Sequence, residues 1–197
     1  MPKNRIEAFA DGIFAFAATL LILNLLVDQK QPLEPQLLQI WPSYVAYAIS
    51  FVTIGIIGAN HHMVMHQIAH VDRFFLMVTV LFLMFIAFIP FPTRLLSLDI
   101  QTPDAKAAAL AYGITLTGTA ILFNVLWRYA ARGRKLLRAD VDDRVVEGIN
   151  RTFAFGPASY AIATVVALIS PQVSAGMFVA IAAFYVLESS VFGRRAT

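Results

Sequence analysis

Residues 5–27 read Arg-Ile-Glu-Ala-Phe-Ala-Asp-Gly-Ile-Phe-Ala-Phe-Ala-Ala-Thr-Leu-Leu-Ile-Leu-Asn-Leu-Leu-Val, an apolar run that holds one aspartate well inside it. An α-helix rises about 1.5 Å per residue, so about 20 such residues cross the roughly 30 Å hydrocarbon core of a bilayer. We therefore expect a transmembrane helix from about residue 6 to residue 27, and this expectation decides the fold class.

Five further apolar stretches have the length of a membrane crossing. They cover about residues 38–59, 74–91, 107–127, 153–169 and 173–192. The second is open to extension past its histidines, and Pro90 and Pro92 are expected to end the third, because proline cannot continue the helical hydrogen-bond ladder. The sequence predicts an all-α membrane protein with six transmembrane helices in a single domain, residues 1–197.

The overall composition supports the membrane class. The chain is 59% hydrophobic and 14% charged, with a mean hydropathy of +0.71. A soluble domain is about 45–50% apolar and about 25% charged. Cysteine is absent, which excludes disulfides, thiolate metal sites and a cysteine nucleophile.

The distribution of basic residues predicts the orientation. With the N-terminus in the cytoplasm, the outer side holds only Lys30, Arg94 and Lys106 of the 15 basic residues. The inner side then holds Lys3, Arg5, Arg73, Arg128, Arg132, Arg134, Lys135, Arg138, Arg144, Arg151, Arg194 and Arg195. The positive-inside rule thus favours six crossings with both termini cytoplasmic. The net charge of +3 reports this orientation, and we expect no nucleic-acid partner.

The basic loop at residues 132–138 has two interpretations. It contains two leucines among its basic residues, so it can lie on the anionic inner leaflet as an amphipathic segment. The simpler interpretation is an ordinary positive-inside loop, and we prefer it.

One face of the first helix forms a continuous apolar stripe with spacings of four and three residues. Its members are Phe9, Ile13, Phe16, Leu20, Leu23 and Val27. The stripe suits contact with lipid or with the bundle core, and it also suits a pore wall that closes by a hydrophobic constriction. Thr19 lies between two stripe residues, where its hydroxyl can face a passing ion or bond back to its own helix.

Other residues of this helix favour contact with protein. Asp11 sits more than a turn inside the apolar run, where an ionisable group usually faces protein or water. Ala8, Gly12 and Ala15 form a small-residue face that allows close helix approach. Asn24 is a polar group that needs a partner on another helix.

The spacing Arg-x-x-x-Phe-x-Asp-Gly at residues 5–12 resembles the signature that opens the first helix of the transmembrane protein 175 family. The resemblance continues with Asn60-His61-His62 after the second helix and with residues 90–93, Pro-Phe-Pro-Thr, at the end of the third. It covers the first half of the chain, and the second half matches only in hydropathy.

This resemblance implies a homotetrameric potassium-permeable channel in which the first helix of each subunit lines a central pore. It places the narrow point at Phe16, with Leu20 and Leu23 as further constricting residues and Thr19 as the position linked to potassium preference. The carbonyl filter of ordinary potassium channels is absent from such channels, and this chain has no Thr-Val-Gly-Tyr-Gly. The chain departs from the family pattern at Ala10, where the family has serine, and at Phe16, where it has the smaller isoleucine.

The polar residues near the cytoplasmic side form a second predicted group. Arg5 and Asp11 are six residues apart and lie on different helix faces, so our hypothesis is that each meets helix 2 or 3 of its own or a neighbouring subunit. The resemblance favours a structural polar network between subunits that includes His61 or His62. The four histidines at 61, 62, 66 and 70 also allow interfacial, pH-sensitive or metal-binding roles, and we expect no bound metal.

We therefore expect a passive potassium channel of a prokaryotic plasma membrane, with no enzymatic activity and no cofactor. The alternative is a proton- or sodium-coupled secondary transporter that uses Asp11. An intramembrane metalloenzyme built on the histidines is a second rival, and no ligands from another helix support it.

Overall fold

The computed structural model describes residues 3–30 and 32–193, with side chains described as far as residue 187. The helices of the described residues are α1 (Lys3–Leu20), η1 (Leu21–Asn24), α2 (Leu33–Gln39), α3 (Trp41–Gln67), α4 (Arg73–Phe88), α5 (Pro90–Asp99), α6 (Ala105–Ala131), η2 (Arg132–Arg134), α7 (Asp143–Val166) and α8 (Pro171–Gly193). The predicted all-helical class is confirmed. Arg194 and Arg195, which the charge distribution predicts to be on the inner side, lie outside the described residues.

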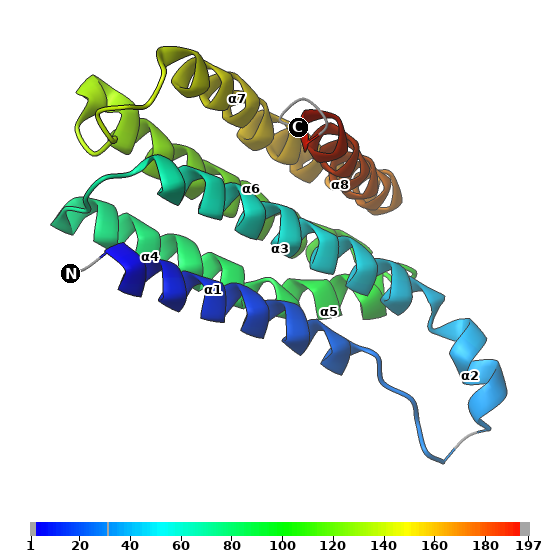
Figure 1. Ribbon diagram of the computed structural model, residues 1–197. Helices are drawn as coiled ribbons and strands as arrows, with labels where there is room; N and C mark the ends of the chain where they lie inside the picture. Colours follow the sequence, from blue (N-terminus) through cyan, green and yellow to red (C-terminus); the bar gives the residue numbers. More distant parts are fainter. Residues whose placement is uncertain (1–2, 31, 194–197) are drawn as a thin grey trace.

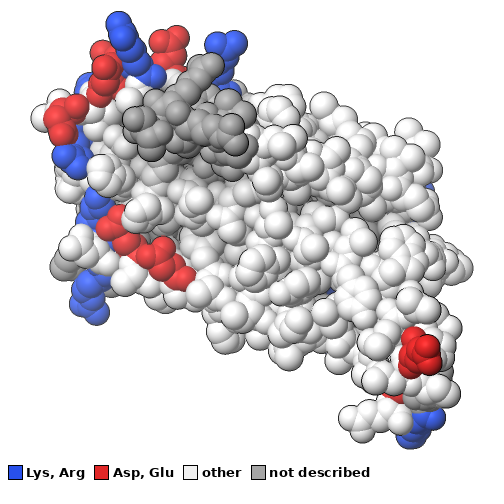
Figure 2. Space-filling view, turned by 45° about the vertical axis from the view of Figure 1, so that its right-hand side comes forward, with Lys and Arg blue, Asp and Glu red and all other residues white. Residues whose placement is uncertain are grey.

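The long helices lie roughly side by side, with α1 at one edge and α7 and α8 at the other (Figure 1). Helix α6 contacts α4, α5, α7 and α8, while α1 packs on α3 and α4. Charged side chains gather toward the two ends of the molecule and leave a broad uncharged band between them (Figure 2). This arrangement is typical of a protein whose middle is surrounded by lipid.

Within the described residues, four segments are long and apolar enough to cross a membrane. They are Lys3–Asn24, Trp41–Gln67, Arg73–Asp99 and Ala105–Arg134. Helix α7 is long but begins with several charged residues, and the apolar described part of α8, Pro171–Leu187, is shorter. Six helical segments therefore match the six predicted stretches, whereas six membrane crossings remain a prediction.

The expectation that Pro90 and Pro92 end the third helix is confirmed, because α4 ends at Phe88 and a separate helix, α5, begins at Pro90. Proline lacks the N–H that the carbonyl four residues earlier needs, so α4 stops at Phe88, and the Ile86 carbonyl accepts from the Ile89 N–H at 3.2 Å instead. Pro90 then occupies the first turn of α5, where a missing N–H costs nothing. The span continues beyond the prolines, and the break becomes a junction inside it.

An interior proline in α7 is compensated by a neighbouring helix. Pro157 has no N–H to donate to the Phe153 carbonyl. The side-chain amide of Asn124, on α6, donates to that carbonyl instead. A backbone acceptor that would otherwise be unsatisfied inside the bundle thereby joins α6 to α7.

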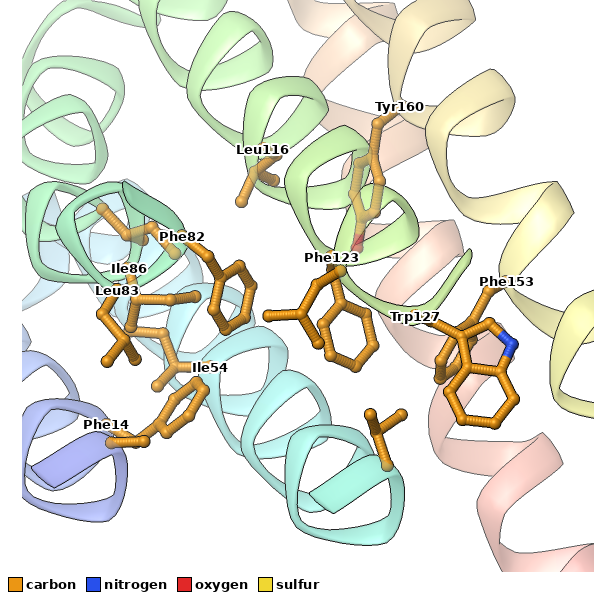
Figure 3. Packing of buried hydrophobic residues seen from close by; sticks show 14 of the residues in the cluster. Phe14, Ile54, Phe82, Leu83, Ile86, Leu116, Phe123, Trp127, Phe153 and Tyr160 are labelled. Carbon is orange, nitrogen blue, oxygen red and sulfur yellow. The ribbon is translucent and has the colours of Figure 1, made fainter. Parts of the chain in front are cut away.

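Aromatic rings form a row through the middle of the bundle. Phe82 of α4 lies 6.1 Å from Phe14 of α1 and 5.3 Å from Phe123 of α6, between ring centroids. Phe123 lies 4.8 Å from Phe153 of α7. Figure 3 shows these rings following one another across the helices. The row joins α1 to the far side of the bundle through buried side chains.

The basic loop after α6 is attached to the loop between α3 and α4. The Ala69 N–H donates to the Leu136 carbonyl at 2.8 Å, and the Arg138 N–H donates to the Gln67 carbonyl at 2.9 Å. Leu136 and Leu137 are buried. Their side chains pack into the protein and are not available to anchor the segment in the inner leaflet, which favours the simpler interpretation of an ordinary basic loop.

Asp72 strengthens this attachment. Its carboxylate caps α4 by accepting from the Phe75 N–H at 2.9 Å, and it accepts from the Tyr129 hydroxyl at 2.5 Å. Lys135 Nζ lies 3.0 Å from the same carboxylate and donates to Tyr129 Oη at 2.6 Å. These hydrogen bonds lower the pKa of Asp72 to about 2. The bond from the Tyr129 hydroxyl has the largest effect, and the bond from the Phe75 N–H has the next largest.

We predict that Asp72→Asn lowers the free energy of unfolding by about 1–2 kcal/mol, because the amide has one acceptor oxygen where the carboxylate uses two. Either the Phe75 N–H or the pair Tyr129 and Lys135 then loses its acceptor. Thermal unfolding in detergent measures the change. The control is Asp140→Asn, which removes an exposed ion pair with Arg138 and should leave the stability nearly unchanged.

The same site predicts a pH dependence. Because the folded pKa of Asp72 is depressed, its contribution is present above pH 4 and is lost as the pH falls from about 4 to about 2. Wild type should therefore lose more stability than Asp72→Asn over this range. Parallel losses in the two proteins would contradict the assignment.

Candidate functional site

One face of α1 is anchored in the bundle. Its buried residues recur every three or four positions and pack toward α3 and α4. They are Ile6, Ala10, Phe14 and Ala17, and Leu21 of η1 continues the same face. Ala10 and Ala17 have no exposed surface at all, so the α1 backbone lies close to its neighbours at these positions.

The predicted apolar stripe lies outside this anchored face. Phe16 is 63% exposed and Leu23 is 61% exposed, and Phe9 is also exposed. Ile13 and Leu20 are half-buried at the edge of the stripe. The alternative that the stripe fills the core of its own bundle is therefore wrong. Its large apolar side chains remain available to lipid or to the axis of an assembly.

The small residues of α1 lie on the exposed surface of the chain. Ala8, Gly12 and Ala15 are exposed, and a side chain added at Gly12 would meet no atom within 4 Å. Each helical residue advances about 100° around the axis, which places these three between Asp11 and the stripe. If this face allows close helix approach, the approaching helix belongs to another molecule.

Thr19 bonds back to its own helix. Its hydroxyl donates to the Phe16 carbonyl at 2.9 Å, which confirms one of the two arrangements considered for it. The side chain is exposed beside the stripe. Because the hydroxyl proton is used, the oxygen presents only acceptor lone pairs to its surroundings, as a cation requires.

The hypothesis of polar partners for Arg5 and Asp11 finds no support within one chain. Both side chains are exposed, and among the described residues no ion pair or hydrogen bond engages either of them. Contacts of these residues with a neighbouring copy stay a prediction.

The two adjacent histidines occupy different environments. His61 is 1% exposed, and its ring packs against the rings of Phe14 and Phe82, with centroid distances of 5.5 Å and 5.8 Å. Its Nε2 atom has no hydrogen-bond partner among the described residues. His62 is exposed. Of the two, His62 is the one placed to reach another subunit.

The candidate metal site does not assemble within one chain. In the described part of the chain, no three His, Asp or Glu side chains come close enough together to hold an ion. His62, His66 and His70 are exposed, whereas His61 points into the aromatic row. The arrangement therefore separates the buried histidine from its neighbours in sequence.

Sequence reasoning missed the anchoring role of Phe14 and its neighbours. The run Ile6, Ala10, Phe14 has the same helical period as the stripe, so a signal for it was present. Periodicity reports that a face is uniform, but it does not report which of two apolar faces packs inward. The larger residues favoured the stripe, yet the small residues of the other face allow the closer packing.

We predict different outcomes for two matched alanine substitutions in α1. Ala17→Leu forces a larger side chain into a position with no free surface, which costs about 1–3 kcal/mol and should lower the yield of folded, protease-resistant protein. Ala15→Leu lies on the exposed face and should preserve folding, but it should reduce the oligomeric fraction in size-exclusion chromatography with light scattering. Equal loss of folded protein in both variants would contradict this orientation of α1.

The sequence of this chain is similar to those of known membrane proteins. The family model "Endosomal/lysosomal potassium channel TMEM175" matches residues 5–90. A potassium channel of Chamaesiphon minutus is 38% identical over 192 residues, covering 95% of each chain. A potassium channel of Streptomyces collinus is 35% identical over 187 residues, covering 93% of this chain and 91% of that protein.

A solved structure agrees with the sequence comparisons. The crystal structure of a lysosomal potassium-selective channel TMEM175 homolog from Chamaesiphon minutus superposes with a TM-score of 0.85 at 37% identity. The match covers 95% of this chain and 97% of that chain. Fold and sequence thus agree over almost the full length, and the chain belongs to the TMEM175 family.

Proposed function

We propose that this protein is a potassium-permeable cation channel that conducts passively and has no enzymatic role. In this proposal the chain is a single six-helix domain of a prokaryotic plasma membrane with both termini in the cytoplasm. Four copies surround a central pore lined by α1. Membership of the TMEM175 family and the names of the two bacterial relatives support potassium as the permeant ion.

The orientation of α1 is the observation that carries the proposal. Asp11 lies eight residues inside the helix, about 12 Å from its start, and its side chain is exposed in the single chain. A carboxylate facing lipid at that depth costs several kcal/mol. The exposed face of α1 is therefore better suited to protein and water than to lipid, as a helix that lines a pore requires.

The proposed constriction is apolar. Rings of Phe16, Leu20 and Leu23 from four subunits narrow the pore, and a narrow apolar passage blocks ions by expelling water when closed. An ion that loses its water in such a passage pays a large desolvation cost, so the open passage must stay partly hydrated. Thr19 oxygens next to Phe16 offer acceptors to a partly dehydrated potassium ion.

The stabilising interactions around this passage are proposed to be polar contacts between subunits. Arg5, Asp11 and His62 are exposed on each chain and are available to neighbouring copies, while His61 holds the α1 position from inside the bundle. No resident cofactor or metal takes part in this proposal.

We predict that Phe16→Ala increases passive potassium flux, because removing four aromatic rings widens the narrowest apolar segment. The measurement is flux from proteoliposomes with a potassium gradient. Phe155→Ala is the matched control, since Phe155 is a similarly exposed phenylalanine on α7, and its flux should equal that of the wild type. Unchanged flux in Phe16→Ala would contradict this placement and would mean that another residue forms the constriction.

The same assay separates the channel from the alternative transporter. A channel gives downhill flux that continues without a proton or sodium gradient. A coupled transporter gives saturable uptake that requires such a gradient and is abolished in Asp11→Asn. Coupled uptake without passive flux would refute the proposed function.

A further inference from the structure

The outer end of α1 is tied to another helix by one side chain. Asn24 is 7% exposed, and its Nδ2 donates to the Pro90 carbonyl at 3.2 Å. Asn24 is the last residue of η1, and Pro90 is the first residue of α5. The bond thus connects the end of the proposed pore helix to the junction between α4 and α5.

The acceptor side of this bond is firmly held. One turn after Pro90, the Thr93 hydroxyl lies 2.9 Å from Ser50 Oγ of α3, and Ser50 Oγ lies 3.0 Å from the Tyr112 hydroxyl of α6. All three side chains are buried. The start of α5 is therefore bonded to α3 and α6, so it can serve as a fixed reference for α1.

The donor side lies in a segment with unusual winding. Residues Leu21–Asn24 form a 3₁₀ helix, and the Leu25 N–H donates to the Ile22 carbonyl at 3.1 Å. Side chains three residues apart eclipse each other in a 3₁₀ helix, whereas in an α-helix they differ by about 60°. The winding of this short segment consequently sets the direction of Leu23 relative to Leu20.

We propose that Asn24 is a positioning residue for the pore: its bond to Pro90 holds Leu21–Asn24 in the 3₁₀ winding and so presents Leu23 in line with Leu20. The inference rests on the proposed function, because it matters only if Leu23 faces a pore. Asn24 itself is buried and touches no permeant ion. Its effect is on the shape of the outer constriction.

A buried amide that only stabilises the fold would act differently. Its loss would lower stability without changing the surroundings of Leu23. Positioning predicts instead that loss of the amide changes both the accessibility of residue 23 and the conductance, even where the chain remains folded. The test therefore needs a local probe at residue 23.

The sequence contains no cysteine, so Leu23→Cys is a single reactive site. We would measure its modification rate in proteoliposomes with a charged, water-soluble thiol reagent, together with potassium flux. The backgrounds are wild-type Asn24, Asn24→Leu, which removes the donor, and Asn24→Gln, which keeps an amide. Thr79→Val is the control, because Thr79 is buried and, among the described residues, its hydroxyl bonds only to the Phe75 carbonyl of its own helix.

We expect Asn24→Leu to change the modification rate by about fivefold or more and to alter the potassium flux. A change of this size corresponds to the loss of one buried hydrogen bond that biases a conformational equilibrium. Asn24→Gln and Thr79→Val should remain within about twofold of the parent protein. If Asn24→Leu does not fold, Asn24→Ala replaces it, since the smaller apolar side chain also lacks a donor.

Two negative results are distinguishable. An unchanged modification rate in the variant that lacks the donor, with flux present, would overturn the positioning role and leave the channel intact. No modification of Leu23→Cys in any background, together with no passive flux, would overturn the proposed function and this inference with it.

Discussion

The inward packing of α1 is the constraint on which the surface of this protein depends. Ala10 and Ala17 bring the α1 backbone close to its neighbours, and Phe14 joins the aromatic row that continues through Phe82 and Phe123. A close-packed interior tolerates few alternative arrangements of such rings. Once this face is fixed, the rotation of α1 about its axis is fixed too, and its apolar stripe has to remain outside.

The two ends of the bundle are held by different kinds of interaction. At the end with the basic loop, backbone hydrogen bonds and the Asp72 carboxylate join two loops to the start of α4. At the opposite end of α1, a single amide from Asn24 reaches Pro90. The first arrangement has several bonds that support one another, and the second depends on one.

Much of this organisation was predictable from the sequence. Hydropathy alone indicates a helical membrane protein, because only long apolar helices explain runs of this length without charge. Helical periodicity identified the stripe that includes Phe16 and Leu23, and polarity identified Asn24 as a residue that needs an interhelical partner. The Arg5 to Gly12 motif predicted the family. Each of these inferences concerns a property of one segment, which the sequence contains in full.

What only the tertiary structure decided is how segments face one another. Two apolar faces of α1 had the same period, and the choice between them depended on whether the neighbours could receive Phe14 and the buried alanines. Pro90 could have ended its span, but the following residues find partners on other helices and the span continues. Leu136 could have entered lipid, but a place in the protein was available to it. Sequence determines the propensity of each segment, whereas these outcomes depend on free energies shared between segments that are far apart in the chain.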